Sequence, residues 1–149
     1  IEPTATVALP TFVHSALAFG LCVPDVWTTE SAPQYVLLTR QVDGGIYTLF
    51  IGARLEGANE PVFRTGMPAG ELQNGGKVVV LNQTVSRQLV VFEGKVKVVT
   101  YGVPRSGGLE FFMYLDAVEH EGQAYGDLDI PATVQAEADA IVSSLSFVK

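Results

Sequence analysis

The stretch from Lys77 to Ala117 constrains the fold of this chain more than any other part of the sequence. It is dense in Val, Phe, Tyr and Leu, and it is interrupted only at Glu93-Gly94 and between Pro104 and Gly108. Short runs of β-forming residues separated by tight turns are typical of an antiparallel meander. The sequence therefore predicts neighbouring strands joined by hairpins over this stretch.

Alternation assigns the two faces of the last of these strands. One face is apolar, and the other carries Phe112 and Tyr114, which predicts partial cover there too, as from a helix. After the Glu93-Gly94 turn, Lys95 and Lys97 alternate with valines and are predicted to be solvent-exposed charges. The residues expected to face the core are Leu109, Phe111, Met113, Leu115 and Ala117.

Three further strands are predicted nearer the N-terminus. The first runs from Leu17 to Val23 and ends at Pro24, and the second runs from Tyr35 to Arg40. The turn Asp43-Gly44-Gly45 then leads into a strand from Ile46 to Leu55. Its expected apolar set is Tyr47, Leu49, Ile51, Ala53 and Leu55, and Gly52 on the other side predicts a bulge or a close backbone approach.

The segment from Glu56 to Gly76 is rich in Gly and Pro and is predicted to be a long loop, with at most a helical turn from Pro68 to Gln73. Long ordered loops in compact domains are often functional. A helix is predicted near the C-terminus, because Asp129 and Pro131 form a start signal. Its predicted buried face is Val134, Ala138, Ile141 and Leu145, and residues 146–148 are expected to add a short edge strand.

These elements predict an α+β fold, with a central antiparallel sheet of about six or seven strands and the C-terminal helix packed on it. A chain of 149 residues fits one domain. We expect residues 1–13 to be a linker or N-terminal extension and residues 14–149 to form the domain. A start rich in Pro, Thr and Ala and lacking Met suggests a trimmed segment after a signal peptide or lipid-anchored tether, and a recombinant fragment would look identical.

Charge is distributed unevenly along the chain. Up to Arg105 there are eight acidic and eight basic residues, whereas from Ser106 to Lys149 there are eight acidic residues and one lysine, so the net charge of −7 lies in the C-terminal third. A surface of this sign repels phosphate backbones, which argues against nucleic acid as a partner. It would attract cations or a basic protein.

Two separated motifs resemble those of a known family. The run from Phe19 to Trp27 (FGLCVPDVW) and the run from Ala138 to Phe147 (ADAIVSSLSF) resemble the first strand and the terminal helix of PsbP-like domains. That family is named for an extrinsic subunit of photosystem II and has a Ran-binding-protein-like fold. The resemblance implies a central sheet between helices, and many bacterial members are exported lipoproteins or tethered domains. The Glu56–Gly76 segment departs from the family, since it has no strong helix where the family packs one.

Carboxylates and a histidine gather late in the chain. Such groups suit a hard or borderline cation such as Ca²⁺ or Mn²⁺, although the spacing matches no calcium loop, and the alternative is a solvated loop that binds no cofactor. The candidate metal ligands are Asp116, Glu119, His120, Glu121 and Asp127. Arg64 and Arg105 lie in loop-like segments and are candidate binding residues, as is Trp27, for which a role in the core is the alternative.

No catalytic pattern is present in the sequence. Neither G-x-S-x-G nor a phosphate-binding or dinucleotide glycine motif occurs, so we expect a protein that is not an enzyme. The sequence favours a non-catalytic binding or assembly module located outside the cytoplasm, secreted, periplasmic or membrane-tethered, with an acidic C-terminal face for a basic partner or a cation. The alternative is a carrier of a small apolar ligand between the sheet and the loop 56–76. A deep apolar pocket under that loop would favour the carrier, and a filled core the module.

Overall fold

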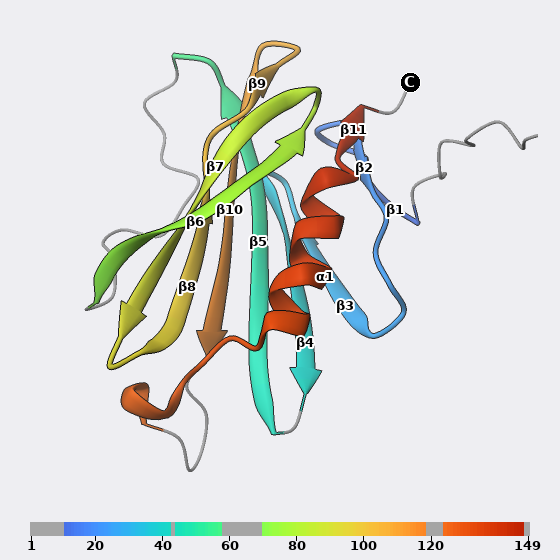
Figure 1. Ribbon diagram of the computed structural model, residues 1–149. Coiled ribbons are helices and arrows are strands. Elements are labelled where there is room, and N and C mark those ends of the chain that lie inside the picture. Colours follow the sequence, from blue (N-terminus) through green and yellow to red (C-terminus); the bar gives the residue numbers. More distant parts are fainter. Residues whose placement is uncertain (1–10, 43, 58–69, 119–123, 148–149) are drawn as a thin grey trace, which may run out of the picture.

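The computed structural model describes residues 11–42, 44–57, 70–118 and 124–147. Most of them belong to one large antiparallel sheet, the main sheet (Figure 1). Its strands, in spatial order, are β3 (Trp27–Ala32), β4 (Tyr35–Val42), β5 (Gly45–Leu55), β10 (Leu109–Val118), β8 (Lys95–Tyr101), β7 (Gln83–Phe92) and β6 (Glu71–Val80), and the short β9 (Arg105–Ser106) pairs with β10.

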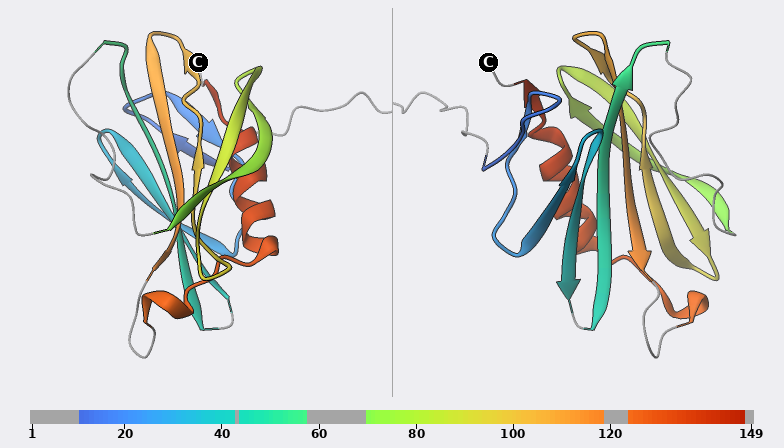
Figure 2. Two further views of the ribbon diagram at one scale, coloured as in Figure 1. Left: turned by 60° about the vertical axis from the view of Figure 1, so that its left-hand side comes forward. Right: turned by 180° about the vertical axis from the view of Figure 1, so that it is seen from behind.

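A second, small sheet lies beside the C-terminal end of the α-helix. It contains β1 (Phe12–His14), β2 (Phe19–Leu21) and β11 (Ser146–Phe147), in the order β1-β2-β11. Helix α1 (Ala132–Ser143) follows the 3₁₀ turn η1 (Tyr125–Asp127) and lies against one face of the main sheet (Figure 2). The chain therefore begins and ends, within the described residues, at the small sheet.

The antiparallel pairing predicted from Lys77 to Ala117 is confirmed, but a third turn at Leu81-Asn82 divides the stretch before Glu93-Gly94, which the sequence predicts to be uninterrupted. Strands β6, β7 and β8 follow one another through hairpins, and β8 pairs with β10. Strands β5 and β10 pair over their whole length without a register shift, from Leu109 opposite Leu55 to Val118 opposite Ile46. This uninterrupted pair is the centre of the main sheet.

The core lies between the main sheet and helix α1. Val134, Ala138 and Ile141 are fully buried and Leu145 is 4% exposed, so the predicted buried face of the helix is confirmed. The odd-numbered residues of β5 and β10 face the helix as expected from alternation, except that Leu55 is 68% exposed at the end of β5. The predicted edge strand after the helix is present as β11.

The other face of the main sheet is covered by its own aromatic rings and one arginine. The ring of Phe50 lies over Gly52, where a Cβ atom would come within 2.8 Å of it, and stacks beside Tyr35 and Tyr114. The Arg54 guanidinium lies 4.9 Å from the centre of the Phe112 ring. The cover predicted for this face is therefore supplied here by side chains, while α1 packs on the opposite face. Of the two interpretations of Gly52, the close approach is correct, because the register of β5 shows no bulge.

The predicted fold class is wrong. Strands account for 61% of the structure and helices for 12%, with one α-helix in the described part of the chain, so the protein is mostly β rather than α+β. The eight-stranded main sheet and the separate three-stranded sheet also replace the single sheet of six or seven strands. The physical reason is that the segment around Phe19–Leu21 pairs with β1 and β11 instead of joining the main sheet.

A second correction concerns the loop predicted from Glu56 to Gly76. Residues 71–76 belong to strand β6, so the helical turn suggested from Pro68 to Gln73 is wrong at its C-terminal half. Glycines at 75 and 76 misled the prediction, because they mark a bulge inside a strand. The register of β6 against β7 shifts between Asn74 and Lys77. Residues 58–69 lie outside the described part.

Candidate functional site

The acidic C-terminal third folds onto the basic residues of the first part of the chain. Among the described residues, four ion pairs each join an arginine at or before position 105 to an acid after it. Their nitrogen–oxygen distances are 2.9 to 3.4 Å. The pairs are Arg40–Glu137, Arg54–Glu110, Arg87–Asp139 and Arg105–Glu110. Three of the eight acids of the C-terminal third, Glu110, Glu137 and Asp139, therefore join distant segments of the chain.

Two of these pairs fasten helix α1 across the main sheet. On the β3–β4 side, Glu137 Oε1 accepts hydrogen bonds from Trp27 Nε1 and Arg40 Nε, both at 2.9 Å. The Trp27 ring is 4% exposed, so this candidate binding residue lies in the core and uses its N–H group to hold the helix. A buried indole with a satisfied donor is the expected form of a core tryptophan.

On the β7–β8 side, Asp139 Oδ1 accepts a hydrogen bond of 2.6 Å from the Tyr101 hydroxyl and lies 3.1 Å from Arg87 Nε. Burial of the phenol, reinforced by the hydrogen bond and negative charge of Asp139, raises the pKa of Tyr101 above its ordinary value. Arg87 also donates to Gly75 O and to Gln135 Oε1. This cluster links the helix to both β7 and β6.

The two lysines after the Glu93-Gly94 turn hold the segment that leads into α1. Lys95 Nζ donates to Gly126 O, and Lys97 Nζ donates to Leu128 O. Lys97 is 1% exposed, so its predicted exposure to solvent is wrong. A register shift between β7 and β8 inserts Lys97 between two paired positions, where it shares the buried face of β8. Burial, together with repulsion from Lys95, lowers the pKa of Lys97.

Two of the five predicted metal ligands lie within the described residues, and the set as a whole stays a prediction. Asp116 lies on β10, and Asp127 lies in η1 with Oδ2 3.5 Å from Ala124 N. Glu119, His120 and Glu121 lie outside the described residues. Within the part of the chain that the structure describes, no group of three or more His, Cys, Asp or Glu side chains could hold a metal ion.

Of the two candidate binding arginines, one lies within the described residues. Arg64 lies outside the described residues. Arg105 is on β9, where Nε lies 3.0 Å from Glu110 Oε2, and its backbone N–H and C=O bond to the side-chain amide of Gln83. Its guanidinium therefore stabilises the end of β10.

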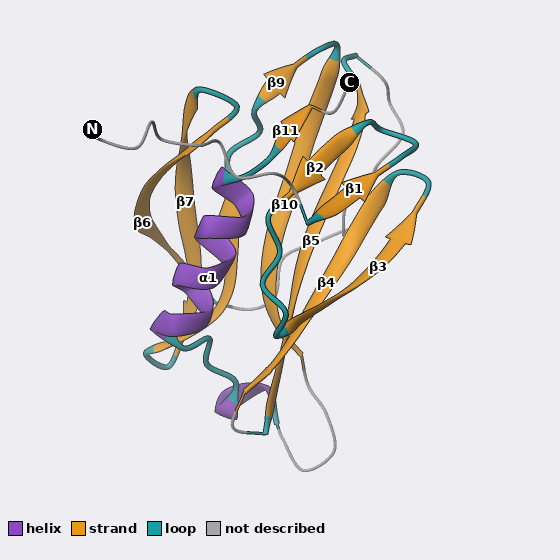
Figure 3. Ribbon diagram, turned by 90° about the vertical axis from the view of Figure 1, so that its right-hand side faces the viewer, coloured by secondary structure: helices purple, strands orange, loops and turns teal. Residues whose placement is uncertain are grey.

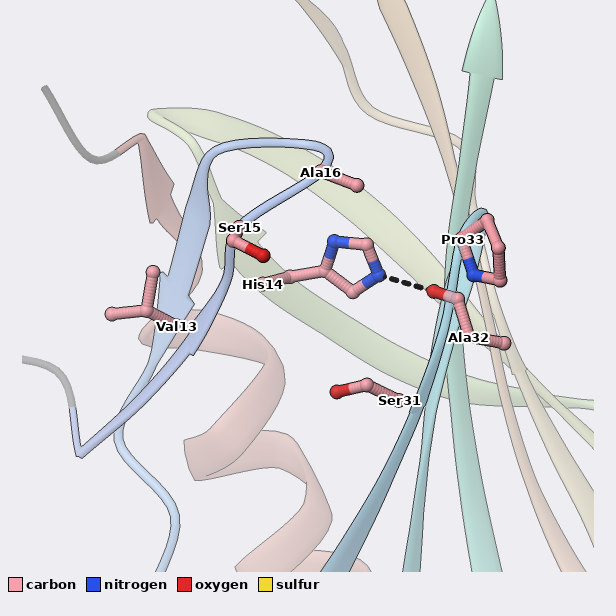
Figure 4. Close-up of a pocket in the computed structure, with 7 residues that line it drawn as sticks. All are labelled: Val13, His14, Ser15, Ala16, Ser31, Ala32 and Pro33. Carbon is pink, nitrogen blue, oxygen red and sulfur yellow. Dashed lines mark hydrogen bonds between the residues drawn. The ribbon is translucent and has the colours of Figure 1, made fainter.

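Two neighbouring pockets lie between β1 and β3, one toward each end of these strands, and we call them together the β1–β3 cleft. One end, of about 290 Å³, is lined by residues 13–16 and 31–33 (Figure 4). The other end, of about 230 Å³, is lined by Thr11, Phe12, Val23, Pro24, Asp25, Trp27 and Thr29. Each end thus has residues of β1 or the loops beside it on one side and residues of β3 on the other. Figure 3 shows strands β1 and β3 next to each other. Strand β1 is not predicted from the sequence, although Phe12 and Val13 are strong β formers.

His14 closes one end of this cleft. Its Nδ1 accepts a hydrogen bond from the backbone N–H of Leu17 (3.1 Å), so the ring proton is on Nε2, which donates to Ala32 O at 2.6 Å (Figure 4). The ring is 3% exposed and stacks on Phe19, with 5.0 Å between ring centres. The imidazole is therefore a rigid tether between the small sheet and the main sheet.

The backbone hydrogen bonds of β4 show which of its residues direct their N–H and C=O groups toward β3. In an antiparallel strand, one residue exchanges both backbone bonds with a given neighbour and the next residue points away from it. Ala53 N on β5 donates to Gln34 O at 3.0 Å, so even-numbered residues along β4 are bonded to β5. The odd-numbered residues, such as Leu37 and Thr39, are consequently bonded to β3.

The same alternation then applies to β3. The register partners of Leu37 and Thr39 are Glu30 and Thr28, so these two residues use their backbone groups toward β4. Thr29 and Ser31 point their N–H and C=O groups away from β4, and each lines one end of the cleft. Strand β3 is the last strand at its side of the main sheet, and no described residue donates to or accepts from these backbone groups. One wall of the β1–β3 cleft is thus an unpaired strand edge.

No family model matches the chain, and neither a curated protein nor a solved structure matches it. In the described ranges, none of the helical segments has the length and apolar character needed to cross a membrane.

Proposed function

We propose that this protein is a non-catalytic binding or assembly module that works outside the cytoplasm, and that it binds its partner at the β1–β3 cleft. The observation that carries the proposal is the unpaired edge of β3 at Thr29 and Ser31, which forms one wall of the cleft. Unpaired backbone donors and acceptors at a strand edge are a ready template for another chain.

The lining of the cleft supports binding rather than chemistry. The lining has two candidate general bases: His14 already uses both ring nitrogens to hold the fold, and Asp25 lines the other end from Ser15 and Ser31. The remaining polar side chains are mostly hydroxyls, which adapt to a partner but need a positioned base to act as nucleophiles. The lining therefore favours recognition.

The packing of α1 favours a partner held at the surface. Large side chains fill the space between the helix and the main sheet, among them Phe111, Met113 and Ile141. The alternative carrier function concerns a pocket between the sheet and the loop 56–76, of which residues 58–69 lie outside the described part of the chain. Kinship with PsbP-like proteins and a location outside the cytoplasm belong to the same proposal, and they are supported by the Phe19–Trp27 and Ala138–Phe147 motifs.

The proposal can be tested by selecting random 12-residue peptides displayed on phage against the purified protein. We expect enriched peptides to bind the wild-type protein and to lose binding to Thr29→Arg, which fills one end of the cleft. Thr28→Arg is the matched control, since Thr28 is the adjacent exposed threonine on β3 and its side chain lies on the other face of the strand. Mass spectrometry should recover the bound peptide unchanged.

Two results would overturn the proposal. If no peptide is enriched, or if the enriched peptides bind Thr29→Arg and wild type equally, the cleft is not the binding site. If the peptide is recovered cleaved or modified by a protein free of contaminating activity, the module is catalytic after all.

A further inference from the structure

We propose that the occupant of the β1–β3 cleft is an extended polypeptide segment that adds to β3 as one more antiparallel or parallel strand. This inference rests on the proposed function and specifies its partner and its mode of binding. In strand addition, main-chain hydrogen bonds provide most of the affinity, and alternate side chains provide specificity. The edge of β3 offers the backbone groups that this mode requires.

The two ends of the main sheet are not equally protected. The opposite end strand, β6, has a register shift between Asn74 and Lys77, and Arg87 Nη1 donates to the bulged Gly75 O. Bulges and lysines are devices that prevent a free edge from pairing with another chain. Strand β3 has neither device, since its six residues keep a continuous register against β4. The edge that faces the cleft is the one left able to pair.

The cleft also limits where the added strand can lie. At one end, His14 Nε2 donates to Ala32 O, so the imidazole stands beside the last residue of β3 and ends the available edge. Pairing is therefore centred on Thr29 and Ser31. The backbone N–H of Trp27 already donates to Pro24 O, so the unpaired edge runs from Thr28 to Ser31 and matches about four residues of a partner at about 3.4 Å per residue.

The charges near the cleft favour a basic segment. Asp25 lines the end of the cleft away from His14, and Glu30 is exposed on β3. Neither carboxylate forms an ion pair with a basic residue in the described ranges. A lysine or arginine in the partner, placed beside Asp25, would complement this charge.

The first test follows individual backbone amides by NMR hydrogen exchange, with a peptide from the phage selection as the probe. In the free protein, the amides of Thr28 and Glu30 should be protected by β4, whereas those of Thr29 and Ser31 should exchange rapidly. Saturating peptide should slow exchange at Thr29 and Ser31 by at least about tenfold and leave Thr28 and Glu30 unchanged.

The second test replaces single amide hydrogens of the same peptide by N-methyl groups. Along the part of the peptide that pairs with β3, every second N-methyl group should weaken binding by about tenfold or more, because it removes one main-chain hydrogen bond and blocks approach. The intervening positions should change affinity by less than about threefold. Asp25→Asn should weaken a peptide that contains lysine or arginine by about twofold to fivefold.

The outcomes separate this inference from the function on which it rests. If Thr29→Arg abolishes binding but the exchange of Thr29 and Ser31 and the N-methyl series show no alternation, the cleft binds a partner and strand addition is wrong. If these amides become protected with rising protein concentration in the absence of peptide, the occupant is a second copy, and the proposal of a foreign segment is overturned. Enrichment of no peptide overturns both proposals.

Discussion

Replacing Tyr101 with phenylalanine isolates the hydrogen bond between strand β8 and helix α1. The Tyr101 hydroxyl is buried and donates to Asp139 Oδ1 at 2.6 Å, and the substitution removes only this hydroxyl from a ring that is 5% exposed. Hydrogen bonds to charged groups contribute about 1.5–3 kcal/mol. The Asp139 side chain is 27% exposed and retains Arg87, so we expect the low end of this range, about 1.5 kcal/mol at pH 7.

The loss should depend on pH in a defined direction. The pKa of Tyr101 is raised above its unfolded value of 10.0, chiefly by burial. Below pH 10 the phenol is protonated in both states and its contribution is complete. Above pH 10 the unfolded state releases the proton first, so the stability of the wild type relative to Tyr101→Phe should fall by about 1.4 kcal/mol per pH unit. The two free energies of unfolding should become equal near pH 11.

Urea unfolding followed by circular dichroism at pH 7, 9, 10 and 11 measures both effects, and thermal unfolding at pH 7 gives the melting temperature. At pH 7 the melting temperature of Tyr101→Phe should lie about 3–6 °C below that of the wild type. Tyr35→Phe is the matched control, because Tyr35 is 37% exposed, and its loss should stay within about 0.5 kcal/mol. Unfolding free energies that stay parallel from pH 9 to pH 11 would contradict the reasoning.

Three further predictions concern other contacts. Burial lowers the pKa of Lys97 in the folded state below 10.5, so between these two pKa values the unfolded state binds more protons and the free energy of unfolding rises with pH. Lys97→Met should lack this rise when urea titrations at pH 8 and pH 10 are compared. Gly52→Ala should cost about 1–3 kcal/mol in thermal unfolding, because its Cβ would lie 2.8 Å from a Phe50 ring atom, whereas Gly126→Ala, with 3.7 Å to its nearest neighbour, should be close to neutral. A double-mutant cycle on Arg40 and Glu137 should give a coupling energy of about 0.5–1 kcal/mol, and a value near zero would show that this pair does not hold the helix.

Periodicity predicts the parts of the fold in which one face is buried and one is exposed. The helix is recognisable by spacing alone, since Val134, Ala138 and Ile141 recur at 3.6 residues and a start signal precedes them. Two turns of the meander are recognisable because they contain glycine or proline, at Glu93-Gly94 and from Pro104 to Gly108, whereas the β6–β7 turn at Leu81-Asn82 contains neither. These local patterns do not reveal which strands share a sheet, and this is why the small sheet is not predicted and the predicted fold class is wrong.

Lys97 shows a second limit of the sequence. Alternation predicts that Lys97 points away from Val96 and Val98, but it does not say which set faces the core, and a lysine is rarely the buried member. Here a bulge places it on the helix side, and the carbonyl of Leu128, 31 residues further along the chain, accepts its hydrogen bond. A partner so distant in sequence is found only once the tertiary structure is known.

The charge asymmetry acquires a different meaning once the ion pairs are placed. Glu110, Glu137 and Asp139 are acids of the C-terminal third, and each is held by an arginine from the earlier, neutral part of the chain. Asp25 and Glu30 belong to that neutral part, yet they have no such partner within the described ranges and lie beside the β1–β3 cleft. Arginines of the first part of the chain pair with acids of the C-terminal third, and the negative charges of Asp25 and Glu30 are left without a basic partner among the described residues. We therefore expect a basic segment to be attracted to the edge of β3 rather than to helix α1. Raising the salt concentration should then weaken peptide binding at the cleft through Asp25, and an Asp25→Asn variant should lose most of that salt dependence.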